Sequence, residues 1–169
     1  AKEYGNGLLH STIRGFVFNF SGSDTLKENF TGMGPMGSRN NIHGSYYTKH
    51  CKITDCEFYS FDVGLYLCGE FDNIEHCRFE GCNRGINCDC PNDNDIHSNY
   101  FIVTNYFGIK MTKPYRTKVY ENYFYHCKGY YIEVDGTLDR ESDEKNINMS
   151  IYSNVMQGGA IGTTIDGVS

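Results

Sequence analysis

The sequence predicts an all-β solenoid of about six stacked coils with two long inserted turns, and three observations support this prediction. A short motif, Ile-x-x-Cys-x-Phe followed at a distance by Gly and an aliphatic residue, recurs along the chain. Its period matches one coil of a solenoid. The 169 residues contain 14 Tyr, 11 Phe and 19 Gly but 3 Pro and no Trp, a mixture that favours strands and tight bends over helices.

The repeats are close enough in spacing to be aligned position by position. Counted from the first full copy, successive motifs start 21, 22, 23 and 32 residues apart. In the later copies Asn replaces the Cys, and one extra residue precedes the closing pair. A partial copy, four clear copies and a weaker one start at Ile13, Ile53, Ile74, Ile96, Val119 and Ile151.

Length and charge exclude several classes of protein. The chain suits a single domain over residues 1–169 and is too short for two. A net charge of −6 and the lack of a basic run argue against nucleic acid as a partner. No run approaches the ~18 apolar residues of a membrane span, so we expect no membrane insertion. Both ends read as repeat sequence rather than as caps, so we expect a fragment of a longer chain.

With this motif the chain resembles the right-handed parallel β-helix superfamily, which includes pectate lyases, alginate epimerases and phage tailspike depolymerases. The resemblance covers roughly residues 8–165. It implies a right-handed parallel β-helix that acts on a polysaccharide, and the tailspike branch implies a homotrimer. The motif is specific for the fold and much less so for the chemistry.

Stacked coils place equivalent residues in columns, about 4.8 Å apart along the axis. One inward column resembles the Asn ladder of the superfamily, in which side-chain amides hydrogen-bond along the axis, and consists of Cys56, Cys77, Asn99, Asn122 and Asn154. Two further inward columns contain Phe61, Cys82, Thr104 and Cys127, and Leu67, Cys88, Met111 and Val134. We therefore expect Cys56, Cys77, Cys82, Cys88 and Cys127 to be buried thiols rather than disulfides.

Two long turns interrupt the repeat, at residues 19–39 and 135–145. In the repeat frame both border the strand that carries the Gly-aliphatic pair, so we expect them to form two walls of a groove over that strand. The first turn should end before a strand near Ile42, which would place His43 on the outward face.

The outward positions of the Gly-aliphatic strand carry the candidate site. One column consists of His43, Tyr66, Asn87, Lys110 and Glu133, and the next of Cys68, Asp89, Thr112 and Asp135. Glu133 and Asp135 should lie ~6.5 Å apart on one strand, and Asp89 and Asp135 ~9.5 Å apart across two coils. Both separations lie within or near the ranges for paired carboxylates in glycoside hydrolysis.

Two mechanisms fit this face. In a hydrolase, Glu133 or Asp135 would be the general acid and Asp89 the base or nucleophile, with Lys110 orienting substrate. In a lyase, Lys110 or an arginine would neutralise a uronate and abstract its C5 proton, while Tyr66 donates to the leaving oxygen. Alternatively, Lys110 and Glu133 form an ordinary surface ion pair.

Other outward residues are less specific. Tyr100 and Tyr123 continue a column from Glu57 and Arg78 and suit either stacking against sugar rings or a subunit interface. We predict no metal and no cofactor, because the Cys-Asp-Cys at residues 88–90 has no second ligand pair at zinc spacing. The histidines, His97 among them, have no Ser or Cys partner that the sequence reveals.

The sequence thus favours a segment of a phage tailspike or tail appendage that binds and cleaves a host cell-surface polysaccharide. Such a segment would assemble in the host cytoplasm and work in the virion tail. A noncatalytic structural or receptor-binding rod is the first alternative. A secreted bacterial polysaccharide lyase or epimerase is the second.

Overall fold

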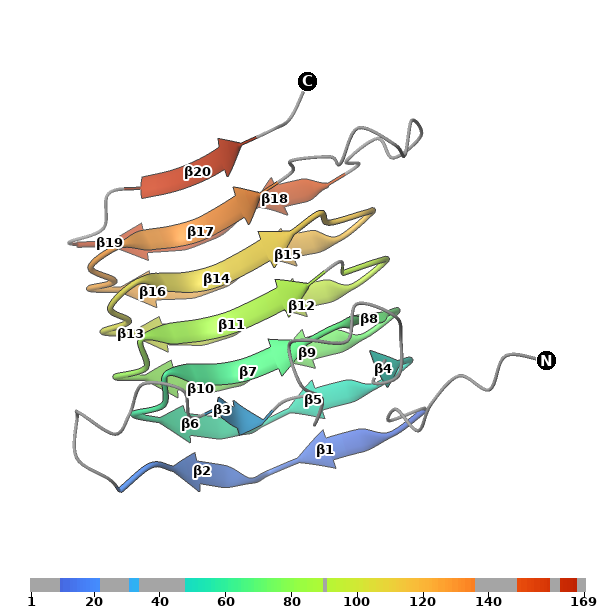
Figure 1. The fold of residues 1–169 in the computed structure, drawn as a ribbon, viewed down its shortest axis with the longest axis horizontal. Coiled ribbons are helices and arrows are strands. Elements are labelled where there is room, and N and C mark those ends of the chain that lie inside the picture. Colours follow the sequence, from blue (N-terminus) through green and yellow to red (C-terminus); the bar gives the residue numbers. More distant parts are fainter. Residues whose placement is uncertain are drawn as a thin grey trace, which may run out of the picture.

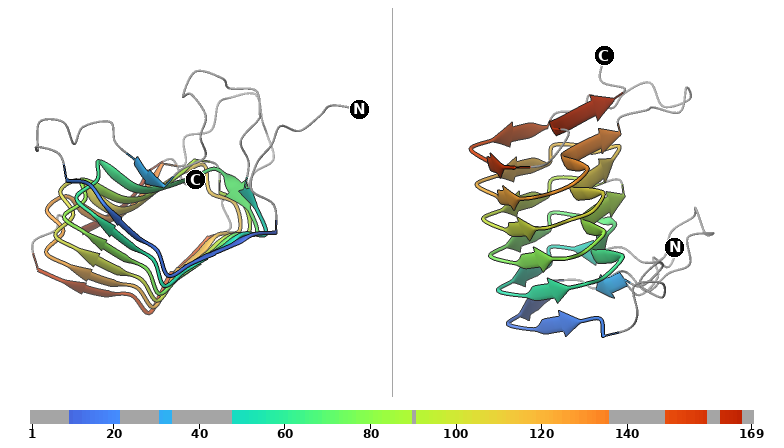
Figure 2. Two further views of the ribbon diagram at one scale, coloured as in Figure 1. Left: turned by 90° about the horizontal axis from the view of Figure 1, so that it is seen from below. Right: turned by 90° about the vertical axis from the view of Figure 1, so that its left-hand side faces the viewer.

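The computed structural model describes residues 10–21, 31–33, 48–89, 91–135, 149–158 and 162–166. Within these residues the chain forms three parallel sheets of six strands each, stacked along one axis (Figure 1). Seen from one end, the coils superpose around a common interior (Figure 2). In the part that the structure describes, no helix is long and apolar enough to span a membrane.

Each coil contributes one strand to each sheet in turn. Sheet 1 consists of β1 (Thr12–Arg14), β5 (Lys52–Thr54), β9 (Asn73–Glu75), β12 (Asp95–His97), β15 (Lys118–Tyr120) and β18 (Ser150–Tyr152). Sheet 2 consists of β2 (Val17–Asn19), β6 (Glu57–Tyr59), β10 (Arg78–Glu80), β13 (Tyr100–Ile102), β16 (Tyr123–Tyr125) and β19 (Val155–Gln157). Sheet 3 consists of β3 (Thr31–Met33), β7 (Val63–Leu67), β11 (Arg84–Asp89), β14 (Phe107–Thr112), β17 (Tyr130–Asp135) and β20 (Gly162–Asp166).

The expected fold class, an all-β parallel solenoid, is confirmed. Four coils, from β5 to β17, follow one another through short turns, and β1–β4 and β18–β20 extend the stack at its two ends. A short fourth ladder joins β4 (Thr48–Lys49) to β8 (Gly69–Glu70) and continues through bridges at Asn92 and Tyr115.

Phenylalanine rings form the centre of the core. Phe58, Phe79, Phe101 and Phe124 are fully buried, and neighbouring rings lie 4.8–5.0 Å apart and within 10° of parallel. Parallel pairing in register places each ring directly on its equivalent in the next coil. The spacing of the rings is therefore the spacing of the strands.

The Asn ladder forms at the bend between sheets 1 and 2, as expected. Asn99 donates its side-chain amide to Asn122 Oδ1 at 3.0 Å, and Asn122 donates to Asn154 Oδ1 at 3.0 Å. The same oxygens accept backbone N–H groups of Asn99 and Asn122. Cys77 continues the column, and its N–H donates to Asn99 Oδ1 at 2.9 Å. The ladder thus satisfies buried backbone groups at a bend.

The prediction for the cysteines is also confirmed. Cys56, Cys77, Cys82, Cys88 and Cys127 are fully buried and unbridged. Burial raises the pKa of the Cys77 thiol to about 12 and also raises that of Cys127. Cys77 and Cys127 are therefore protonated at neutral pH, and all five side chains pack as small apolar groups.

The strand predicted near Ile42 lies outside the described residues, but its predicted place beside β7 is wrong. The strand that pairs with β7 at the edge of sheet 3 is β3, so it lies inside the predicted first turn. Its Gly32-Met33 matches Gly64-Leu65 of the next coil, and a Cβ at Gly32 would lie 2.7 Å from the Gly64 carbonyl oxygen. The close approach of these backbones requires glycine. Gly32-Met33 has the Gly-aliphatic pattern of the repeat, but it lies among residues of loop-like composition, so the sequence prediction missed this strand.

A residue with positive φ turns the chain at the bend between sheets 2 and 3 in coil after coil. Gly81 (φ 64°) and Gly158 (φ 67°) hold this position in two coils, whereas Val103 (φ 53°) holds it in another. A β-branched residue in this conformation is strained, and glycine is not. We expect Val103→Gly to raise the free energy of unfolding by about 1 kcal/mol, measured by urea denaturation.

The matched control is Val155→Gly, because Val155 is also an exposed valine but lies in the extended strand β19. Glycine there should destabilise. Equal losses from both substitutions would contradict the assignment of strain to Val103.

A second polar ladder lies at the bend between sheets 3 and 1, and it contains a buried carboxyl group. Asp72 accepts from the Cys51 N–H at 2.9 Å and from the Thr48 hydroxyl, and Asn94 occupies the same position one coil on. Burial raises the pKa of Asp72. The folded protein therefore holds this proton more tightly than the unfolded chain does. The contribution of Asp72 to stability is full below its ordinary pKa and is lost as the pH rises through the raised value.

We accordingly expect Asp72→Asn to raise the free energy of unfolding at pH 7 by about 1 kcal/mol, because the amide keeps an acceptor for Cys51 and carries no charge. At pH 4 the gain should be smaller. Urea titrations of both proteins at the two pH values test this. A larger gain at pH 4 than at pH 7 would contradict it.

Candidate functional site

The outer face of sheet 3 carries the residues predicted as a site. Tyr66, Asn87, Lys110 and Glu133 lie in register on β7, β11, β14 and β17, which run side by side in Figure 1. Asp89, Thr112 and Asp135 form the neighbouring column on the same strands. The predicted register of these described residues is confirmed. Their alternation with buried Cys88, Met111 and Val134 explains why they point outward.

The side chains on this face contact one another across coils. Lys110 Nζ lies 2.5 Å from Glu133 Oε1, and both side chains are half-buried. The Tyr66 hydroxyl donates to Asp89 Oδ2 at 3.4 Å. Lys110 also lies over the Phe107 ring, 5.8 Å from its centroid. The face therefore combines a cation, carboxylates, an amide and a phenol on a rigid sheet.

The carboxylates on this face are spaced by the sheet itself. Glu133 and Asp135 are two residues apart on β17 and point to the same face, so their Cα atoms are ~6.6 Å apart along the strand. Asp89 and Asp135 are separated by the strand that carries Thr112, or ~9.6 Å. Both spacings of the backbone positions lie within or near the ~6.5–9.5 Å that separates the two carboxyl groups of inverting glycosidases, which leaves room for a water.

Not all predicted residues belong to this face. His43 lies outside the described residues, and β3, not a strand near Ile42, is the neighbour of β7. Of the predicted groove walls, most of residues 19–39 and nearly all of 135–145 likewise lie outside the described residues.

Tyr100 and Tyr123 lie on the outer face of sheet 2, so the structure separates them from the sheet 3 residues. Tyr100 is 52 % exposed, and its ring centroid lies 6.0 Å from that of Tyr123. Tyr123 donates its hydroxyl to Gln157 Oε1 at 2.7 Å. Glu57 and Arg78, the charged residues of the same column, lie on the two preceding coils.

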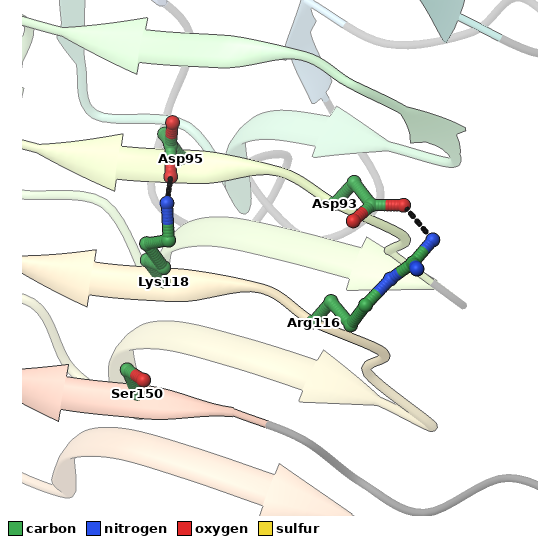
Figure 3. A pocket seen from close by; sticks show the side chains of 5 residues that line it. All are labelled: Asp93, Asp95, Arg116, Lys118 and Ser150. Atoms are coloured by element: carbon green, nitrogen blue, oxygen red, sulfur yellow. Dashed lines mark hydrogen bonds and ion pairs between the residues drawn. The ribbon is translucent and has the colours of Figure 1, made fainter.

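A pocket of about 290 Å³ lies on the outer face of sheet 1 and its neighbouring bend, where the sequence analysis placed no site (Figure 3). Arg116 Nη2 lies 2.5 Å from Asp93 Oδ2, and Lys118 Nζ lies 3.6 Å from Asp95 Oδ1. Both pairs join adjacent coils, and Ser150 completes the lining. The sequence does contain a signal for this pocket. The acidic turn at residues 91–95 comes one coil before Arg116 and Lys118, so stacking of the coils places the acidic residues beside the basic ones. Each charge in the pocket is already neutralised by its neighbour.

Metal-binding geometry is not found in the part of the chain that the structure describes. There, no group of three or more His, Cys, Asp and Glu side chains is arranged to hold a metal ion.

Comparison with known proteins identifies a family. The model of the family described as "Periplasmic copper-binding protein (NosD)" matches residues 5–167. The chain belongs to the NosD family. Neither the comparison with curated proteins nor that with solved structures found a match. The family match thus covers almost all of the 169 residues, and the part of this NosD-family chain that the structure describes is a parallel β-helix.

Proposed function

We propose that this NosD-family protein binds a polysaccharide along the outer face of sheet 3. The observation that carries the proposal is the in-register column of Tyr66, Asn87, Lys110 and Glu133, with the carboxylates of Asp89 and Asp135 beside it. A repeating ligand suits a surface that repeats with every coil. Hydrogen-bond donors, acceptors and a ring held on a rigid sheet cost little conformational entropy on binding.

The finer proposal is a tailspike or tail-appendage segment that binds and cleaves a host cell-surface polysaccharide, assembled as a homotrimer in a virion. Support comes from the parallel β-helix and from the carboxylate spacing on sheet 3. In the hydrolytic mechanism Glu133 or Asp135 acts as general acid and Asp89 as base or nucleophile, while Lys110 orients the substrate. The Lys110–Glu133 contact supports such a positioning role for Lys110.

Copper binding, which the family description names, is less well supported by this chain. Copper prefers thiolate, thioether and imidazole ligands, and the thiolate is the form of cysteine that binds metal. Burial raises the pKa of the Cys77 and Cys127 thiols, so both are protonated at neutral pH, and no group of three or more His, Cys, Asp and Glu side chains among the described residues is arranged to hold a metal ion. The described residues therefore do not fit a copper site.

The binding proposal predicts a loss of affinity from one lysine and not from another. We expect Lys110→Ala to weaken binding to the cognate polysaccharide about tenfold or more, because a charge-assisted hydrogen bond to the ligand is lost. Affinity electrophoresis on capsule and wall polysaccharides from candidate hosts measures this. Lys118→Ala is the matched control, since Lys118 is also ion-paired across coils but lies on sheet 1. A loss of affinity in Lys118→Ala but not in Lys110→Ala would place the binding site at the sheet 1 pocket and contradict the proposal.

Cleavage is tested on the same polysaccharides by reducing-end release and ultraviolet absorbance. New reducing ends without absorbance indicate a hydrolase, and Asp135→Asn, Glu133→Gln and Asp89→Asn should then identify its acid and base. Absorbance from unsaturated uronates indicates a lyase and assigns the chemistry to Lys110 and Tyr66. Binding without product would make this segment a receptor-binding or structural rod.

A further inference from the structure

A glutamate, a histidine and a serine meet on the outer face of sheet 1, away from the sheet 3 site. His97 on β12 is the register neighbour of Glu75 on β9, and Ser98 follows His97 at the bend. His97 Nε2 lies 3.2 Å from Glu75 Oε2, and His97 Nδ1 lies 3.2 Å from Ser98 Oγ. Each ring nitrogen therefore has one partner within hydrogen-bond distance.

The imidazole is fixed in orientation by its surroundings. Its ring stacks on Tyr120 with centroids 4.7 Å apart and planes within 10°, and His76 approaches it edge-on. The side chains of His97 and Glu75 are 16 % and 13 % exposed. Such packing holds a general base in a single geometry without further cost when a substrate binds.

Glu75 is likewise held in place, and it is held as a carboxylate. Lys52 Nζ lies 2.5 Å from its Oε1, and the Asn73 amide donates to its Oε2 at 3.1 Å. The hydrogen bond from the Lys52 ammonium is the main cause that lowers the pKa of Glu75. An ionised Glu75 places the imidazole proton on Nε2 and leaves the Nδ1 lone pair facing Ser98. Glu121 Oε2 lies farther from Ser98 Oγ, at 3.5 Å.

We propose that Ser98, His97 and Glu75 form an acyl-transfer site that hydrolyses small esters such as O-acetyl groups. The arrangement has the three elements of such a site, a nucleophile, a base within hydrogen-bond reach and a group that orients the base. Glu75 acts through His97 and is a positioning residue. The inference is independent of polysaccharide binding on sheet 3, because a small ester alone suffices to test it.

The reaction consumes one water for each ester. Ser98 Oγ attacks the carbonyl carbon while its proton passes to His97 Nδ1. The bond from that carbon to the alcohol oxygen then breaks, and the leaving alcohol takes the proton from His97. Water attacks the resulting acyl-serine with His97 again as base, which releases the carboxylic acid and restores Ser98.

A serine in a second coil provides an internal comparison. Ser153 occupies the same bend as Ser98 two coils later, with the same φ of 54°, but it follows Tyr152 rather than a histidine. It shares the backbone conformation of Ser98 but has no histidine before it in the sequence. Reactivity of Ser98 in excess of Ser153 therefore reports on His97 and not on the bend.

The test is hydrolysis of p-nitrophenyl acetate together with labelling by a fluorophosphonate, with the labelled residue located by mass spectrometry. We expect label on Ser98 and none on Ser153. Ser98→Ala should lower the hydrolysis rate about 100-fold or more. Ser98→Gly should do the same while favouring the positive φ, and it provides the test if the alanine variant does not fold. Ser153→Ala should leave the rate unchanged.

Glu75→Gln separates a positioning role from a structural one. It should lower kcat and leave KM for the ester nearly unchanged, because a neutral amide can donate to His97 Nε2 and no longer keeps the imidazole proton there. An unlabelled Ser98, or a rate unchanged in Ser98→Ala and Ser98→Gly, would overturn the proposal. So would a rate lost in His97→Asn but kept in both Ser98 variants, since the imidazole would then act without an acyl-serine.

Discussion

Asn122→Ala is expected to lower the free energy of unfolding by about 4 kcal/mol, because the substitution breaks the ladder where it is buried. Asn122 Oδ1 accepts the backbone N–H and the side-chain amide of Asn99, and its Nδ2 donates to the Ile96 carbonyl at 3.0 Å. Both Asn99 and Asn122 are almost fully buried. Alanine leaves these backbone groups without partners in the interior, and each unpartnered group costs ~1–3 kcal/mol.

The control for this prediction is Asn154→Ala. Asn154 makes the same kind of contacts, but it lies at the last described step of the ladder and is only half-buried. Water can replace some of the hydrogen bonds of the Asn154 side chain, so the free energy of unfolding should fall by about half as much as in Asn122→Ala. Urea denaturation of both variants measures the difference. A cost below about 1 kcal/mol for Asn122→Ala would show that the ladder is not a main source of stability.

Gly85→Val is expected to prevent folding or to cost at least about 4 kcal/mol, because the space for a side chain at this position is occupied. A Cβ at Gly85 would lie 2.5 Å from the Gly108 carbonyl oxygen and 2.6 Å from Phe101 Cδ1. The first atom belongs to the neighbouring strand and the second to the buried Phe stack. Relief of the contact requires β11 and β14 to separate or the ring to leave its place in the stack.

Asn87→Val on the same strand is the matched control, since Asn87 points outward and Gly85 faces the core. It introduces the same side chain at a half-exposed position and should change stability by less than about 1 kcal/mol. Circular dichroism and urea titration distinguish the two variants. A soluble Gly85→Val protein with unchanged stability would mean that sheet 3 adjusts far more easily than its spacing suggests.

The candidate site on sheet 3 followed from counting alone. Once the spacing from Ile53 to Ile74 defined a coil, Asn87 had to lie beside Tyr66 and Lys110 beside Glu133, because parallel coils stack equivalent positions. The count failed where a long turn interrupted it. Residues 19–39 carry loop-like composition, and β3 lies among them because Gly32-Met33 fits the Gly-aliphatic column against β7.

The sequence by itself determined the solenoid, the inward Asn and Cys columns, and the neighbours on each outward column, since one repeat period specifies them all. Only the tertiary structure decided which side chains meet. It selected the Lys110–Glu133 ion pair that the sequence left as an alternative, placed β3 beside β7, and brought Glu75 to His97 beside Ser98. The physical reason is that a repeat period determines where a Cβ lies, whereas side-chain contacts also depend on rotamers, bends and neighbouring charges that no spacing encodes.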